Sequence, residues 1–430
     1  MNYKILENTF LKEKTYVFDH PTGLKIYISP KEGYSKKCAI FGVNYGSIDS
    51  CFKLRTQDQF REVPDGIAHF LEHKLFESED GDAFTKYAKT GASANAFTSF
   101  QMTAYYFTCT DRFEENLKIL SDLMQTPYFT PENVAKEQGI IGQEINMYLD
   151  DPGWRVYFNM LEAMYHRFPV KKDIAGSVES ISHITSDLLF ECYRTFYTAP
   201  NMTLCITGDL DPIKTAEYAG RLVKNMNAGK EVDRYFEDEP PTVVTNHVEQ
   251  ELSVSIPIFY IGFKDNHNDL VSDALVKKEL TGKMLLDILF GRSSTFFDQL
   301  YKKGLINDNF DHDFTCEIRY AHSILSGESE HPEQVHEQVL ACIQQAKEQG
   351  IEDSVFQRQK KLIKSQFLRQ LNNIDITARN LMEAHFKGYH LYDLVKICDE
   401  ITLQDVTGYL EQNLKEELCV LSIIKPKKGE

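Results

Sequence analysis

The sequence lacks any hydrophobic run that approaches the length of about 18 residues needed to span a membrane. Its first residues, MNYKILENTFLKEKTYVF, carry charges throughout and have no apolar core of signal-peptide length, so we expect no secretory signal there. Its nine cysteines are odd in number and show no C-x-x-C spacing, which is untypical of a disulfide framework and typical of reduced thiols. We therefore expect a cytoplasmic protein without a membrane span.

Acidic residues outnumber basic residues in the sequence. Lys and Arg total 47 against 64 Asp and Glu, which gives a formal net charge of −17. Proteins that bind nucleic acid gather Lys and Arg to meet phosphates, so this balance argues against nucleic acid as a main partner. The rest of the composition, 42% hydrophobic and 26% charged, is ordinary for a globular protein, and 430 residues suffice for two domains of about 200 each.

The stretch PDGIAHFLEHKLFE, residues 64–77, contains the motif H-x-x-E-H. At helical period His69 and His73 leave one face of a helix a turn apart, which suits two ligands of one zinc ion. Glu72 lies beside them, close enough to reach a metal-bound water without being a ligand. Asp65 is expected to be the N-cap of this helix. A plainer interpretation, two buried histidines with a solvated glutamate between them, stays open at this point.

A second helix is predicted to begin after Thr130, which precedes a proline and suits the N-cap. Glu137 and Glu144 are two turns apart on it and share a face. We expect the helix to be largely apolar, so that its carboxylates need a partner, because it carries Ile140, Ile141, Ile145 and Met147. A metal with two histidine ligands needs a third, which makes Glu144 the candidate ligand and Glu137 an orienting carboxylate. The alternative is a solvated acidic stripe.

Extended and helical segments alternate along the rest of the chain. Strands are expected over 24–30, 38–49, 253–263 and 418–426, extended chain over 92–109, and helices over 81–92, 113–125 and 275–291. Between residue 330 and the last strand the pattern is mainly helical. Residues 224–251 are polar, acidic and interrupted by two prolines, which predicts a linker.

The motif H-x-x-E-H, followed about seventy residues later by E-x6-E, resembles the pitrilysin/insulinase family of zinc peptidases, the group with the inverted motif. Two further segments are similar to that family. They are GASANAFT with the following T-x-Y-Y-F, over 91–107, and YTAPNM with ITGD, over 197–209. The resemblance covers essentially the whole chain.

The resemblance implies a role for each residue of the motifs. His69, His73 and Glu144 are then the ligands of one zinc ion per chain. Glu72 is the general base, and Glu137 is a supporting carboxylate of the catalytic site.

Fold and activity follow from the same resemblance. It implies an α+β fold with two homologous domains, each a mainly antiparallel β-sheet with helices packed on one face. The first, a zinc-binding peptidase domain, takes residues 1–224, a linker 225–250, and the second domain 251–430. The implied activity is that of a zinc-dependent endopeptidase, cleaving peptides or small proteins in an enclosed chamber, with substrate backbone against Asn95 and Ala96. The alternatives are a dedicated peptide maturase or modification-pathway accessory, and a non-catalytic scaffold subunit.

One segment departs from the family pattern. Residues 291–305 resemble a family segment that carries an Arg and a Tyr in contact with substrate, but this chain reads LYKKGLIN at 300–307, without arginine. Four related domains enclose the family's chamber and this chain supplies two, so the resemblance implies a dimer. We expect a heterodimer with a paralogous subunit that lacks the zinc motif but carries the Arg/Tyr pair. A homodimer in which Tyr301 or Lys302 substitutes stays open.

Overall fold

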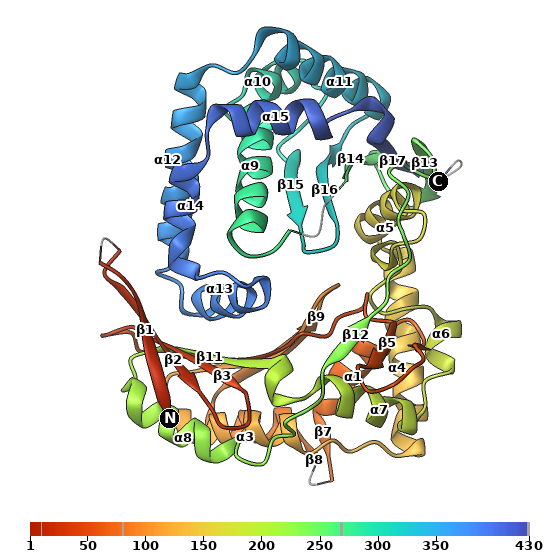
Figure 1. Ribbon diagram of the computed structural model, residues 1–430. Coiled ribbons are helices and arrows are strands. Elements are labelled where there is room, and N and C mark those ends of the chain that lie inside the picture. Colours follow the sequence, from red (N-terminus) through yellow and green to blue (C-terminus); the bar gives the residue numbers. More distant parts are fainter. Residues whose placement is uncertain (10, 80, 267–269, 428–430) are drawn as a thin grey trace.

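Each half of the chain forms a β-sheet with helices packed on it, and in Figure 1 the second half lies above the first. The computed structural model describes residues 1–9, 11–79, 81–266 and 270–427. Within those ranges no helix is long and apolar enough to cross a membrane.

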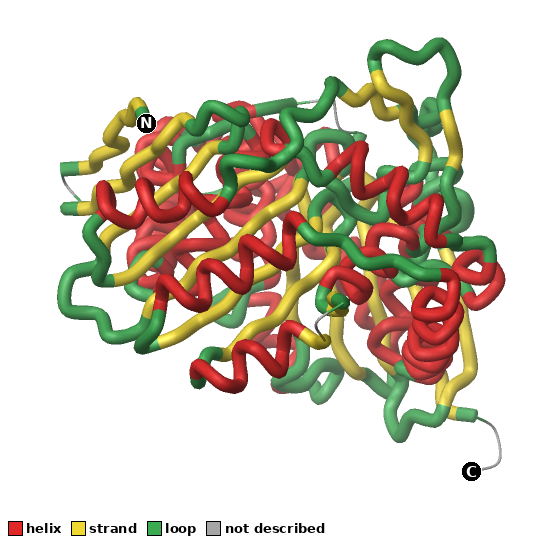
Figure 2. The backbone as a smooth tube through the Cα atoms, turned by 90° about the horizontal axis from the view of Figure 1, so that it is seen from below, coloured by secondary structure: helices red, strands yellow, loops and turns green. Residues whose placement is uncertain are grey.

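The helices follow the two halves in order. Those of the first half are α1 Ile67–Leu75, α2 Ala83–Thr90, α3 Phe113–Gln125, α4 Pro131–Asp150, α5 Pro152–Met164, α6 Val178–Ser182, α7 Ser186–Phe196 and α8 Pro212–Leu222. Those of the second are α9 Ser272–Phe290, α10 Thr295–Lys302, α11 Pro332–Gln349, α12 Asp353–Gln370, α13 Ile374–Lys387, α14 Leu394–Glu400 and α15 Leu403–Asn413. Seen from below, helices lie over the strands of the first sheet (Figure 2).

The first half contains a seven-stranded sheet in the order β1-β2-β3-β11-β4-β10-β9. Its strands are β1 Asn2–Asn8, β2 Glu13–Asp19, β3 Lys25–Pro30, β4 Lys37–Val43, β9 Ser93–Thr98, β10 Thr103–Cys109 and β11 Met202–Gly208. β11 runs parallel to β3, and all the other neighbours are antiparallel. The order leaves β9 at one edge of the sheet.

The second sheet repeats this arrangement in the order β13-β17-β14-β16-β15. Its strands are β13 His247–Leu252, β14 Ile258–Asp265, β15 Asp311–Cys316, β16 Ala321–Glu328 and β17 Cys419–Pro426. β13 is parallel to β17 and the remaining pairs are antiparallel, as in β3-β11-β4-β10-β9. The prediction of an α+β fold with two related, mainly antiparallel domains is confirmed.

The two halves exchange one helix each. α5 of the first half packs on β14 and β17, and α13 of the second half packs on β4 and β11. Each sheet is therefore covered on one face by helices of its own half and on the other by the exchanged helix. The central strands β4 and β14 each carry a glycine at this contact. A Cβ at Gly42 would overlap the sulfur of Met382, and one at Gly262 that of Met160.

The stretch predicted as a linker contains strand structure. β12 Val232–Arg234 pairs with β5 Cys51–Leu54 of the first half, and β5 also pairs with β6 Arg61–Glu62. Further along, β13 belongs to the sheet of the second half. The segment therefore joins a strand partner in one half to a strand partner in the other.

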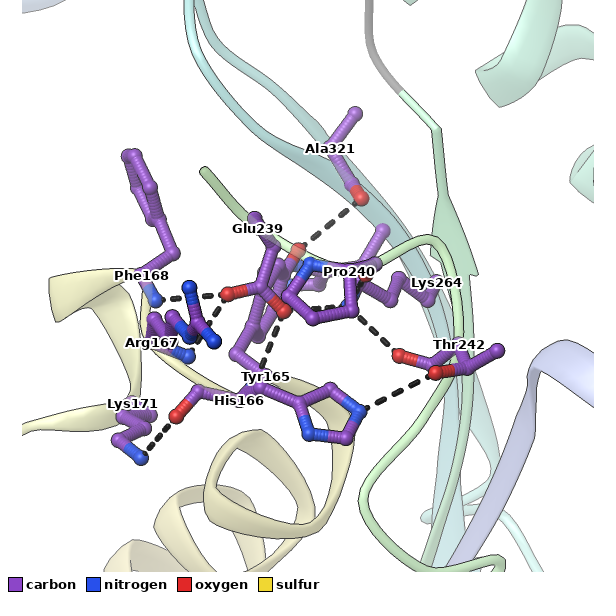
Figure 3. Close-up of polar contacts among 11 residues, drawn as sticks. Tyr165, His166, Arg167, Phe168, Lys171, Glu239, Pro240, Thr242, Lys264 and Ala321 are labelled. Atoms are coloured by element: carbon purple, nitrogen blue, oxygen red, sulfur yellow. Dashed lines mark hydrogen bonds and ion pairs between the residues drawn. The ribbon is translucent and has the colours of Figure 1, made fainter. Parts of the chain in front are cut away.

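A single carboxylate, that of Glu239, anchors the middle of this segment (Figure 3). It accepts hydrogen bonds from the backbone N–H groups of residues 166–168, each at 2.8 Å, and from Nζ of Lys264 at 2.5 Å. Lys264 is buried and also donates to the carbonyls of Pro240 and Thr242. Because residues 166–168 follow α5 and Lys264 lies on β14, the anchor connects both halves.

Candidate metal centre

Helix α1 carries both histidines of the motif. Its N-cap is Gly66, whose φ of 89° favours glycine and where a Cβ would overlap the carbonyl oxygen of Ala175. The prediction that Asp65 caps this helix is wrong, because its carboxylate pairs instead with Lys172 at 2.9 Å. The apolar face of α1 is buried, with Ile67, Phe70, Leu71 and Leu75 in the core of the first half.

Helix α4 brings two carboxylates against α1. Thr130 caps it, as predicted. The expectation that the helix is largely apolar is wrong, because Ile140 and Met147 are 45% and 59% exposed while Ile141 and Ile145 are buried. α4 is therefore amphipathic, and its Glu137 and Glu144 lie on the side that faces α1.

Glu144 meets the two histidines. Its Oε1 lies 3.7 Å from Nε2 of His69, and its Oε2 lies 3.5 Å from Nε2 of His73. Two atoms bound tetrahedrally to one zinc ion are about 3.3–3.6 Å apart, given bonds of about 2.0–2.2 Å. Among the described residues, these three side chains are the only group of three or more His, Cys, Asp or Glu able to hold an ion. Two imidazoles and one carboxylate fit a catalytic zinc ion with one position left for water.

The state of His69 agrees with this fit. Its side chain is buried, and its Nδ1 has no hydrogen-bond partner in the part of the chain that the structure describes. Burial, together with the neighbouring His73, lowers the pKa of His69 to about 4. The ring is therefore neutral at physiological pH, which is the form that binds a metal, with Nε2 turned towards Glu144.

Glu137 supports the second histidine, at 3.1 Å between its Oε1 and Nδ1 of His73. Burial is the largest single effect and disfavours charge on both groups, but the hydrogen bond between them and the neighbouring charges together outweigh it, so the pKa of Glu137 is lowered and that of His73 is raised. Lys74, the next residue on α1, is fully buried. Its Nζ pairs with Glu77 and lies 3.6 Å from Oε2 of Glu137, so it places a positive charge behind this pair.

Glu72 lies at the same cluster. Its Oε2 accepts a hydrogen bond from the hydroxyl of Thr98 at 2.6 Å. Burial raises the pKa of Glu72, and the hydrogen bond from Thr98 offsets part of that effect. A cavity of about 250 Å³ opens beside these groups and is lined by Glu72 together with His69, Glu144 and Ala96. A water or a peptide bond in this cavity is within reach of both Glu72 and the three candidate ligands.

The two predicted substrate residues lie on the edge strand β9. Ala96 is opposite Tyr105 of β10 and lines the cavity. Asn95 is exposed, and its Oδ1 accepts a hydrogen bond from the backbone N–H of Ala96 at 2.8 Å. That N–H is therefore turned away from β10, towards the free edge of the sheet.

Three side chains of the site were not singled out from the sequence. Thr98 holds Glu72, Lys74 backs Glu137, and the hydroxyl of Tyr148 donates to Oε1 of Glu144 at 2.6 Å. For Tyr148 a signal existed, because it follows Glu144 by four residues and so shares its helix face. The contact of Thr98 with Glu72 could not be predicted from the sequence, because it depends on how β9 packs on α1.

Among the residues of the second half that the structure describes, no such cluster lies at the matching place. α9 packs on β15 and α12 there, as α1 packs on β9 and α4 in the first half. In place of ligands it carries Glu279, which pairs with Lys283 at 2.7 Å and with Lys387 at 3.0 Å. An ion pair therefore takes the position that the ligand cluster has in the first half.

Both halves of the chain match known protein families. Residues 60–178 match the family described as insulinase (peptidase family M16), and residues 183–363 match the peptidase M16 inactive domain. The chain is 41% identical over 428 residues, 99% of both chains, to the uncharacterized zinc protease YmfH of Bacillus subtilis (strain 168).

Two solved structures extend the comparison. A putative M16-like peptidase from Alicyclobacillus acidocaldarius, 32% identical, superposes with a TM-score of 0.94 over 98% of this chain and 100% of that one. Pitrilysin, 17% identical, shares the fold with a TM-score of 0.79, and 99% of this chain covers 47% of pitrilysin. Since the identity to a zinc protease spans nearly the full length, the chain belongs to the M16 family of insulinase-type peptidases.

Proposed function

We propose that this protein is a zinc-dependent endopeptidase that cleaves peptides or small proteins, with Glu72 as its general base. The observation that carries the proposal is the position of Glu72. It lines the same cavity as His69, His73 and Glu144 but is not one of the three side chains that converge as ligands. A bound zinc ion supplies Lewis acidity, which acidifies water and polarises a carbonyl.

In this proposal the residues of the site have separate roles in metal binding and proton transfer. His69, His73 and Glu144 hold the ion, and Glu72 takes a proton from the attacking water and passes it to the leaving amine. Because the hydroxyl of Thr98 occupies Oε2 of Glu72, the other carboxylate oxygen is the one available for this proton. The raised pKa of Glu72 makes it a stronger base than an exposed glutamate.

The substrate is proposed to lie extended along β9. An edge strand binds a peptide through main-chain hydrogen bonds, which tolerate varied side chains. The free edge of β9 leads past Ala96 into the cavity with the ligand cluster. This arrangement suits an endopeptidase with modest selectivity.

The test compares Glu72→Gln with the wild-type protein. We expect the variant to lose peptide hydrolysis and to keep one zinc ion per chain, because Glu72 is not a ligand. Glu115→Gln, on the exposed side of α3, is the matched control and should change neither quantity. Loss of zinc from Glu72→Gln would show that the roles are misassigned.

We further propose that the working unit is a heterodimer with a paralogue that lacks the zinc motif. The second half carries no Arg/Tyr pair at 300–307, and Arg292 lies 3.5 Å from Asp308, where it is engaged locally. Tyr301 is 46% exposed on α10. The length of pitrilysin supports the pairing of two such units, because a chain about twice as long has room for a second unit of this kind.

A further inference from the structure

Tyr148 lies against Glu144 at the wall of the cavity that holds the three candidate ligands. It lies one turn beyond Glu144 on α4, and its hydroxyl donates to Oε1 of Glu144 at 2.6 Å. Its ring stacks on Trp154 of α5, with the ring centroids 4.4 Å apart and an interplanar angle of 13°. Trp154 is held in turn by a hydrogen bond from its Nε1 to Oδ2 of Asp173 at 2.5 Å.

Both oxygens of Glu144 face the imidazoles. They lie at 3.7 Å from Nε2 of His69 and 3.5 Å from Nε2 of His73, so geometry alone would let both bind one ion. The hydroxyl of Tyr148 breaks this equivalence, because it occupies a lone pair of Oε1 and leaves Oε2 free.

We propose that Tyr148 is a positioning residue that makes Glu144 a one-oxygen ligand and so keeps a coordination position open for water. The inference rests on the proposed function, since it concerns the same zinc ion. A catalytic zinc site has three protein ligands and one open position, and a second carboxylate oxygen would crowd that position. Replacing a residue that hydrogen-bonds to a metal ligand commonly lowers metal affinity or activity by about 10–100-fold.

The test replaces zinc by Co²⁺ in the purified protein and compares wild type with Tyr148→Phe. Four-coordinate cobalt absorbs visible light several-fold more strongly than five-coordinate cobalt, so the spectrum reports coordination without any turnover. We expect the strong, four-coordinate spectrum for wild type and a several-fold weaker one for the variant. In the zinc enzyme kcat should fall about tenfold with KM nearly unchanged.

Tyr157→Phe is the matched control, because Tyr157 lies on α5 and packs on Phe158 and Tyr260 rather than on a ligand. It should keep the wild-type spectrum and kcat. The single tryptophan, Trp154, stacks on residue 148, so its emission checks that Tyr148→Phe is folded as wild type is.

Two outcomes separate this inference from the proposed function. If wild type binds cobalt and Tyr148→Phe gives the same spectrum, the role of Tyr148 is wrong and the metal site stands. If wild type binds neither cobalt nor zinc, the metal site itself is wrong and the inference fails with it.

Discussion

Nδ1 of His73 lies 3.1 Å from Oε1 of Glu137, which stands two turns before Glu144 on the same helix. This contact assigns the Nδ1 proton to the side of Glu137 and leaves Nε2 facing Glu144. One helix therefore supplies both a candidate ligand, Glu144, and the group that orients another candidate ligand, His73. The arrangement depends on Glu137 remaining charged, and buried Lys74 provides the balancing cation.

Replacing Lys74 by Met should weaken zinc retention about tenfold. Methionine keeps the length of the side chain but removes the charge near Glu137, so the carboxylate holds His73 less firmly. Competition with a chelator measures the change in affinity. Lys118→Met, which breaks an exposed pair with Asp122 on α3, is the control and should leave zinc affinity unchanged. Equal affinity in Lys74→Met and wild type would contradict this role.

Replacing Glu239 by Gln should lower the free energy of unfolding by at least about 2 kcal/mol at pH 7, because buried Lys264 loses its carboxylate. Although burial opposes it, the hydrogen bonds from Lys264 and from residues 166–168 lower the pKa of Glu239 below 4.5. A lowered carboxyl pKa gives stability that is complete above the unfolded pKa and is lost as pH falls through the folded one.

Urea unfolding measures the free energy of unfolding of wild type and of Glu239→Gln at pH 7 and at about pH 4 and below. The difference between the two proteins should shrink at the lower pH. Glu237→Gln is the matched control. Its pair with Arg167, at 3.8 Å, is exposed on both sides, so its loss should cost less than about 1 kcal/mol. A difference between Glu239→Gln and wild type that stays constant with pH would show that the charge of Glu239 is not its source.

Two local signals were read correctly from the sequence. The helix predicted over 113–125 is α3, and Thr130 begins α4, because apolar spacing and capping residues act within a few positions. The resemblance to the family implied that His69, His73 and Glu144 come together, and the structure places these three side chains close enough to hold one ion. Asp65 failed as a cap because the turn before α1 needs the positive φ of Gly66, next to the distant Ala175.

Features that depend on distant contacts could not be predicted. Nothing local in α5 or α13 indicates that each packs on the sheet of the other half. The exposure of Ile140 and Met147 follows from which side of α4 meets α1, and the hydrogen bond from Thr98 to Glu72 follows from how β9 packs on α1. The contacts of these residues depend on tertiary packing, which the residue types alone do not predict.

Replacing Ala96 by Pro should raise KM for peptides about tenfold while the protein still folds. Proline is tolerated on an edge strand where the N–H points outward, and the N–H of Ala96 is bonded to Asn95 rather than to β10. A peptide that pairs with this edge loses one hydrogen bond in the variant, worth about 1 kcal/mol. Ala96→Ser keeps the N–H and should retain the wild-type KM. If Ala96→Pro binds peptides normally, they do not pair with β9 at this residue.

The isolated chain should hydrolyse peptides slowly, and adding a paralogous subunit with the Arg/Tyr pair should raise the rate about a hundredfold. The reason is electrostatic, because donors aimed at the developing oxyanion contribute about that much, and the second half has no Arg/Tyr pair at 300–307. Steady-state hydrolysis by the purified chain, with and without the paralogue, measures the effect. Tyr301→Phe separates the alternatives. In a heterodimer it should leave the rate unchanged, whereas a homodimer in which Tyr301 substitutes should lose activity with it. Full activity of the lone protein, unaffected by added partner, would contradict the heterodimer.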